Sequence, residues 1–149
     1  MRAVTAGVGV CVALVAIGCS SNSGGGTSSP TTPTNPSPST PTATFSQVSS
    51  QVFTPACVGC HTDDGRTPAG GLNLKSSVAY AGLVNVASSG KPGAIRVIPG
   101  DPNNSYLVQK LEGAAGIVGL RMPRNGPPYL SDAQVALIRQ WIAAGAGNN

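Results

Sequence analysis

Histidine is nearly absent from this 149-residue chain, which contains one, His61. A site that needs two imidazoles from one molecule is therefore excluded. Charged residues make up only 9% of the chain. The basic ones lie singly rather than in clusters, so a nucleic-acid-binding surface is not expected. Long alternating runs of polar and apolar residues are also missing, so the sequence does not favour a β-rich fold.

Cysteine is rare too, and two of the four cysteines lie near the N-terminus. We predict that residues 1–18 are a lipoprotein-type signal peptide. Arg2 is its only charge, and the apolar run at 8–17 is too short for a membrane-spanning helix. Gly18-Cys19 resembles the lipobox of bacterial lipoproteins, in which the cysteine is lipidated and becomes the first residue. Cys11 leaves with the signal peptide. An ordinary signal peptide cut nearby is the alternative.

After Cys19 the chain consists almost entirely of Ser, Thr, Pro, Gly and Asn, without charge, up to about residue 43. Such a segment cannot bury enough apolar surface to offset the entropy lost on ordering. Its prolines favour extended, semi-stiff polyproline conformations. We predict that residues 19–43 are a disordered tether between a membrane and one folded domain at 44–149. A leader that acts only as a spacer is the alternative.

The other two cysteines belong to the motif Cys57-Val58-Gly59-Cys60-His61. This is the C-x-x-C-H pattern by which c-type haem is attached. Two thiols separated by a short spacer can both bond covalently to one porphyrin, and the histidine that follows can bind the iron as its proximal ligand. The alternatives are a structural disulfide, a redox-active C-x-x-C, or half of a zinc site. Zinc is disfavoured because the chain has no second cysteine pair and no further histidine.

A haem iron with one histidine ligand leaves its other face for a second ligand. If Met1 is removed with the signal peptide, Met122 is the only methionine, and it precedes Pro123 in a loop rich in Gly and Pro. This composition suits a backbone that wraps over a ring. We therefore predict that Met122 is the second iron ligand. Core packing is the ordinary alternative for a lone methionine, and a lysine or water is the alternative ligand.

Helical periodicity dominates the folded part. The first predicted helix follows an N-cap at Thr44 or Ser46, and Pro55 ends it just before Cys57. Short helices are expected at 77–84 and at 105–111, the latter stopped by Gly113. The last helix begins at a capping box formed by Ser131 and Gln134, and Gly145 ends it. Its apolar stripe consists of Val135, Ile138, Trp141 and Ile142.

Residues 45–147 resemble the class I-type, monohaem cytochrome c domains of exported bacterial proteins. The shared features are a helix before C-V-G-C-H, a late Met-Pro loop, the segment V-I-P-G-D-P at 97–102, and a final amphipathic helix with Trp141. The resemblance implies a small all-α fold that wraps one covalently bound haem. It also implies that Trp141 meets a small residue, such as Ser49, where the first and last helices cross.

The resemblance further implies a one-electron carrier rather than an enzyme. Haem c would be held by Cys57 and Cys60 and ligated by His61 and Met122. The expected partners are redox proteins of a respiratory chain and a membrane, bound through a lipid on Cys19, with no small-molecule substrate. The protein would be exported and lipid-anchored, periplasmic or at the cell surface, for instance at the outer membrane. An open-site haem protein (gas-sensing or peroxidase-like) and a non-haem lipoprotein with a Cys57–Cys60 disulfide are the alternatives.

Overall fold

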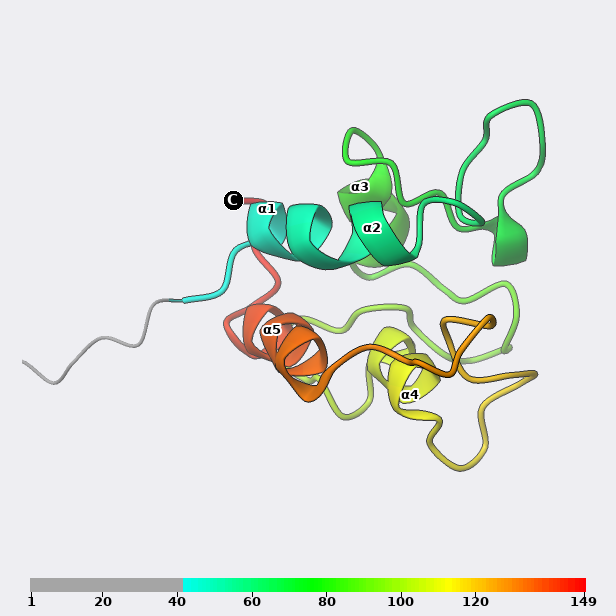
Figure 1. Cartoon of the computed structure of the whole chain (residues 1–149). Coiled ribbons are helices and arrows are strands. Elements are labelled where there is room, and N and C mark those ends of the chain that lie inside the picture. Colours follow the sequence, from blue (N-terminus) through cyan, green and yellow to red (C-terminus); the bar gives the residue numbers. More distant parts are fainter. Residues whose placement is uncertain (1–41) are drawn as a thin grey trace, which may run out of the picture. The chain divides into compact units, whose positions relative to one another are not determined.

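The structure is a computed structural model that describes residues 42–149 (Figure 1). The predicted signal peptide and most of the predicted tether lie outside these residues. Within them the chain is helical and contains no strand, only two isolated bridges, Val84–Val97 and Ala87–Ile95. The prediction of an all-α fold is therefore confirmed. None of the helices in this part of the chain is long and apolar enough to cross a membrane.

The helical elements follow one another from the N-terminal to the C-terminal end of the described part. They are α1 (Phe45–Val48), the π-helix η1 (Ser49–Phe53), α2 (Thr54–Ala56), the 3₁₀ turn η2 (Ala69–Gly71), α3 (Ala79–Leu83), α4 (Tyr106–Glu112) and α5 (Asp132–Ala143). The first three form one uninterrupted helical run (Figure 1). The two longest helical segments therefore lie at the beginning and at the end of the described part of the chain, with short helices and loops between them in the sequence.

The first helical segment has Thr44 as its N-cap. The Thr44 side chain accepts a hydrogen bond from the N–H of Gln47 in a capping box. The predicted end just before Cys57 is confirmed, because α2 ends at Ala56, one residue after Pro55. A π turn precedes the proline, and the N–H of Thr54 donates to the carbonyl of Ser49, five residues back. The regular α-helical ladder is thus already interrupted before Pro55, so its missing N–H is tolerated.

Helix α5 forms as its sequence predicts. The capping box of Ser131 and Gln134 is present, and the four stripe residues Val135, Ile138, Trp141 and Ile142 are all buried. The helix ends at Ala143, and Gly145 follows with a φ of 98°. Few residues other than glycine adopt this conformation, so the glycine turns the chain back after the helix.

The core lies where α5 packs against α1 and α4. An aromatic cluster joins α1, α3 and α5: the ring of Phe45 lies 5.3 Å from the Trp141 ring and 5.3 Å from the Tyr80 ring. Ser49 is also buried. These contacts join the N-terminal and C-terminal helices of the domain and leave a cavity between α2, α3 and α4.

Candidate cofactor site

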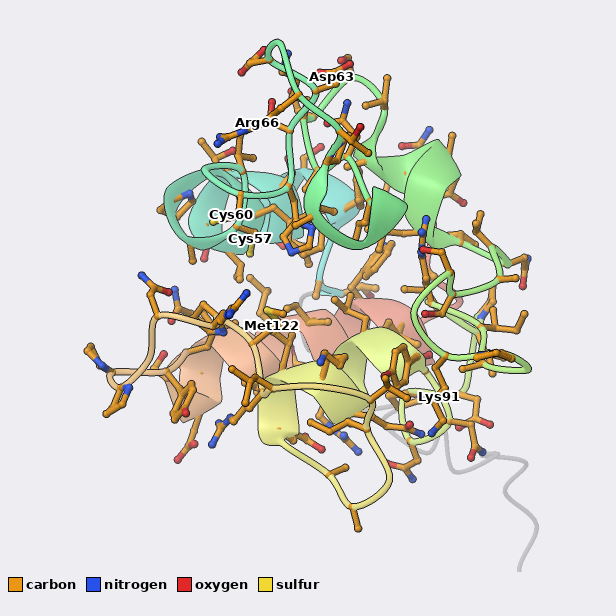
Figure 2. All side chains as sticks on the ribbon, turned by 90° about the vertical axis from the view of Figure 1, so that its right-hand side faces the viewer. Cys57, Cys60, Asp63, Arg66, Lys91 and Met122 are labelled. Carbon is orange, nitrogen blue, oxygen red and sulfur yellow. The ribbon has the colours of Figure 1, made fainter. Side chains whose placement is uncertain are left out.

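A cavity of about 1010 Å³ lies between the segment after α2 and the loop after α4. Its volume is at the upper end of the range for cofactor sites, about 300–1,000 Å³. The sequence-predicted residues Cys57, Cys60, His61 and Met122 all line it. Figure 2 shows Met122 on the segment opposite the one that carries the two cysteines. Most of the remaining wall is aliphatic, with contributions from Leu72, Leu74, Leu83, Leu107, Leu111 and Leu120.

The C-x-x-C-H motif forms a tight turn directly after α2. The N–H of Cys57 donates to the carbonyl of Phe53 at 2.9 Å, which continues the helical path by one residue. The N–H groups of Cys60 and His61 then both donate to the carbonyl of Cys57, at 3.1 and 3.0 Å. This turn brings both sulfurs and the imidazole to one wall of the cavity. Both thiols are free, so the structure contains no Cys57–Cys60 disulfide.

His61 is oriented by the backbone of a later segment. Its Nδ1 lies 3.2 Å from the carbonyl oxygen of Leu72. A carbonyl only accepts, so the hydrogen bond requires that Nδ1 carry the proton, which leaves the lone pair on Nε2. The same segment is bound again where the N–H of Leu74 donates to the His61 carbonyl at 2.8 Å. This arrangement fixes the tautomer that a metal-binding imidazole needs.

Met122 is half-buried and packs against the core. Its N–H donates to the carbonyl of Lys110 at 2.9 Å, which joins its loop to α4. Arg121 makes a second link to α4, since its Nε donates to the Leu111 carbonyl at 2.7 Å. The loop segment that carries the thioether is thus held beside α4 by hydrogen bonds of Arg121 and of the Met122 backbone.

The two thiols differ in their surroundings. Cys60 is exposed, whereas Cys57 is partly covered and its Sγ lies 3.8 Å from the Val52 carbonyl. Burial raises the pKa of the Cys57 thiol from 9.0 to about 11. At neutral pH almost all of Cys57 is therefore the thiol, which is a much weaker nucleophile than the thiolate.

We expect iodoacetamide to alkylate Cys57 at least about tenfold more slowly than Cys60 in the reduced, haem-free protein, because only thiolates react readily. The rate at Cys57 should keep rising with pH up to about 11. Peptide mapping by mass spectrometry separates these two residues from Cys11 and Cys19. In strong denaturant the two rates should become equal, and equal rates under native conditions would contradict the burial of Cys57.

Arg96, Lys110 and Arg124 also line the cavity, and they are the only charged residues that do so in the described part. The guanidinium of Arg96 connects two segments of the chain by hydrogen bonds. Its Nη1 donates to the Gly82 carbonyl at 2.8 Å and its Nη2 to the Gly71 carbonyl at 3.1 Å. Burial lowers the pKa of Arg96 from its usual value, but an arginine stays charged in proteins. The wall of the cavity is therefore apolar with a positive edge.

Arg96 was not among the site residues predicted from the sequence. The carbonyls that its guanidinium binds belong to Gly82, Gly71 and Gly70, 14 to 26 residues away in the chain, so no local motif marks it. The basic residues lie singly in the sequence, and Arg96 is held within the loop structure beside the cavity. Only the three-dimensional path of the chain places its guanidinium there.

The residues present fit a c-type haem. Two thiols for covalent attachment and an imidazole with a free Nε2 lie on one wall, and a thioether lies on the opposite segment, around an aliphatic interior. Within residues 42–149 no three His, Cys, Asp or Glu side chains converge as a bare metal site would require. A covalently attached haem would use each of these donor groups.

Comparison of the chain with protein-family models, with curated proteins and with solved structures gave no match. The functional assignment therefore depends on the chemistry of the site.

Proposed function

We propose that the chain is a one-electron carrier that holds one covalently attached haem c with His61 and Met122 as axial ligands. One observation supports this most strongly. A single aliphatic cavity of about 1010 Å³ is lined by both free thiols of the C-x-x-C-H turn, by His61 and by Met122. When bound, the haem iron would supply the one-electron redox couple.

Each residue of the site has a separate role. The thioether bonds of Cys57 and Cys60 would prevent loss of the group from an exported protein. The Leu72 carbonyl holds the His61 ring in one tautomer, which makes Nε2 available as a ligand. Met122 offers a neutral thioether, a ligand that raises the redox potential. With the haem bound, the aliphatic wall would exclude water, and a low-polarity environment also tunes that potential.

The proposal includes anchoring by a lipid on Cys19. A flexible segment between the lipid and the domain would raise the local concentration of the carrier at membrane-bound redox proteins. Stable anchoring takes more than one acyl chain or an added charge signal. A lipid-modified N-terminal cysteine carrying several chains would satisfy this requirement.

The test is co-expression of the full chain with a cytochrome c assembly system. We expect one haem per chain that survives denaturing electrophoresis and gives a c-type absorption spectrum. The double variant Cys57→Ser, Cys60→Ser should lose essentially all covalent haem. The matched control is Cys19→Ser, which removes another cysteine and should keep the haem while losing the lipid mass. A wild-type chain with no covalent haem would exclude the proposal.

A further inference from the structure

The loop that carries Met122 is attached to the rest of the domain through one helix. Residues 114–122 follow α4 and contain no regular secondary structure (Figure 1). In the described part of the chain, every hydrogen bond that leaves these residues ends on α4. We call residues 114–122 the methionine loop. Its position beside the cavity therefore depends on a small set of contacts with a single helix.

Lys110 makes more of these contacts than any other residue of α4. Its carbonyl accepts a hydrogen bond from the N–H of Met122 at 2.9 Å. Its ammonium donates to the carbonyl of Val118 at 2.9 Å and to the carbonyl of Leu120. The main chain and the side chain of one residue thus bind the methionine loop at Met122 and at two positions just before it.

The other contacts lie close to Lys110 on the same helix. The N–H of Val118 donates to the hydroxyl of Tyr106 at 2.9 Å, and Nε of Arg121 donates to the Leu111 carbonyl at 2.7 Å. Tyr106 and Lys110 are four residues apart, so both lie on one face of α4. The methionine loop is therefore bound along that face, and Lys110 is the residue that binds it at several points.

The charge of Lys110 is directed to these carbonyls. None of the ion pairs of the described residues includes Lys110. A lysine in the last turn of a helix is ordinarily solvated and favours the helix dipole, but Lys110 is half-buried and lines the cavity. Hydrogen bonds from an ionised donor are stronger than neutral ones. An ammonium also has three donors on a compact head, so it can bind two carbonyls from one position.

We propose that Lys110 is the positioning residue for Met122, and that its side chain keeps the thioether at the second axial position of the iron. The inference rests on the proposed function and names what controls that ligand. The ammonium binds the carbonyls of Val118 and Leu120, two and four residues before Met122. Loss of both bonds would raise the fraction of molecules in which the methionine loop is open. An outside ligand binds in proportion to that open fraction.

The first measurement follows carbon monoxide binding to the reduced, haem-loaded full chain by stopped-flow absorbance. The main variant is Lys110→Leu, because leucine favours a helix and keeps an apolar side chain but cannot donate. We expect its binding rate to rise by about tenfold, since two charge-assisted hydrogen bonds no longer hold the loop closed. Lys110→Arg keeps the charge and the donors, so its rate should stay within about threefold of the wild type.

The second measurement distinguishes positioning from ordinary structural stability. Urea unfolding of the oxidised protein is followed by the weak sulfur-to-iron absorption band and by the helical circular dichroism signal. In Lys110→Leu the midpoint of the band should fall further than the midpoint of the helical signal, because the loop opens before the domain unfolds. If Lys110→Leu does not fold, Lys110→Gln takes its place, since glutamine is neutral and shorter and cannot make both charged bonds.

Lys91→Leu is the matched control. Its ammonium lies 5.2 Å from the centre of the Tyr106 ring, so it is another lysine beside α4. No hydrogen bond joins Lys91 to the methionine loop in the part of the chain that the structure describes. The variant loses the same charge, and its carbon monoxide rate should stay within about twofold of the wild type.

Three results would contradict the inference. Equal carbon monoxide rates in Lys110→Leu and Lys91→Leu would overturn it, and so would equal shifts of the two urea midpoints in Lys110→Leu. In both cases the electron carrier stands, because the wild type keeps its haem and its sulfur band. A wild type without covalent haem or without that band would overturn the carrier and this inference together, and it would be seen before any variant is compared.

Discussion

Replacing Met122 by alanine is expected to remove the sulfur ligand from the iron of the haem-loaded protein. The oxidised form should lose the weak long-wavelength absorption band of sulfur-to-iron ligation, and the reduced form should bind carbon monoxide readily. The midpoint potential should fall by about a tenth of a volt or more, since axial ligands tune haem potentials over about 0.8 V. Absorption spectroscopy, carbon monoxide titration and a redox titration measure these three changes.

The variant Met122→Leu separates ligation from packing. Leucine keeps most of the apolar volume at this half-buried position but has no lone pair, so it should show the same spectral changes as alanine with a smaller loss of stability. Retention of the sulfur band in Met122→Leu would rule out Met122 as the ligand. If the wild type itself lacks the band and binds carbon monoxide, the open-site haem protein becomes the better assignment.

Replacing Trp141 by alanine is expected to destabilise the domain by about 3–5 kcal/mol, the usual cost of removing a large aromatic side chain from a core. Trp141 is only 1% exposed, and its ring meets Phe45 where α5 packs on α1. Small domains are stable by about 5–15 kcal/mol, so this loss should leave a large unfolded fraction under mild denaturing conditions. Urea unfolding followed by circular dichroism gives the free energy of unfolding.

The conservative variant Trp141→Phe tests how much of this effect belongs to the indole N–H. In the wild type, Nε1 donates to the Gly147 carbonyl at 2.8 Å and holds the turn after α5 against the helix. Phenylalanine keeps an aromatic ring but loses this donor, at an expected cost of about 1–3 kcal/mol. A loss below about 1 kcal/mol for Trp141→Ala would show that the crossing of α1 and α5 is not the centre of stability.

The ends of the described helices were largely predictable because local chemistry determines them. The capping boxes at Thr44 and Ser131 and the left-handed Gly113 after α4 each act within one turn of a helix. The π turn before Pro55 was not predictable in this way. A shift of one hydrogen bond by one residue leaves the spacing of apolar side chains nearly unchanged, so the sequence pattern carries no mark of it.

The residues of the candidate site also differ in whether the local sequence predicts them. The thiols and His61 are adjacent in the sequence, so their shared wall followed from the motif, and Met122 stood out because methionine is scarce. By contrast, the carbonyl that orients His61 comes from Leu72, 11 residues away, and the loops joined by Arg96 are further apart still. Backbone acceptors have no sequence signature, because every residue has a carbonyl.

The bond between His61 and Leu72 has a consequence for how this protein can vary. Its acceptor is a main-chain oxygen, so changing the side chain at 72 leaves the acceptor in place. The position of that oxygen depends instead on the number of residues between His61 and Leu72. The exposed side chains of residues 62–71 should therefore tolerate substitution better than the buried Thr62 or the left-handed Gly65, Gly70 and Gly71, whereas a single insertion or deletion would misalign the imidazole. The length of this loop therefore matters for the orientation of the imidazole as well as its composition.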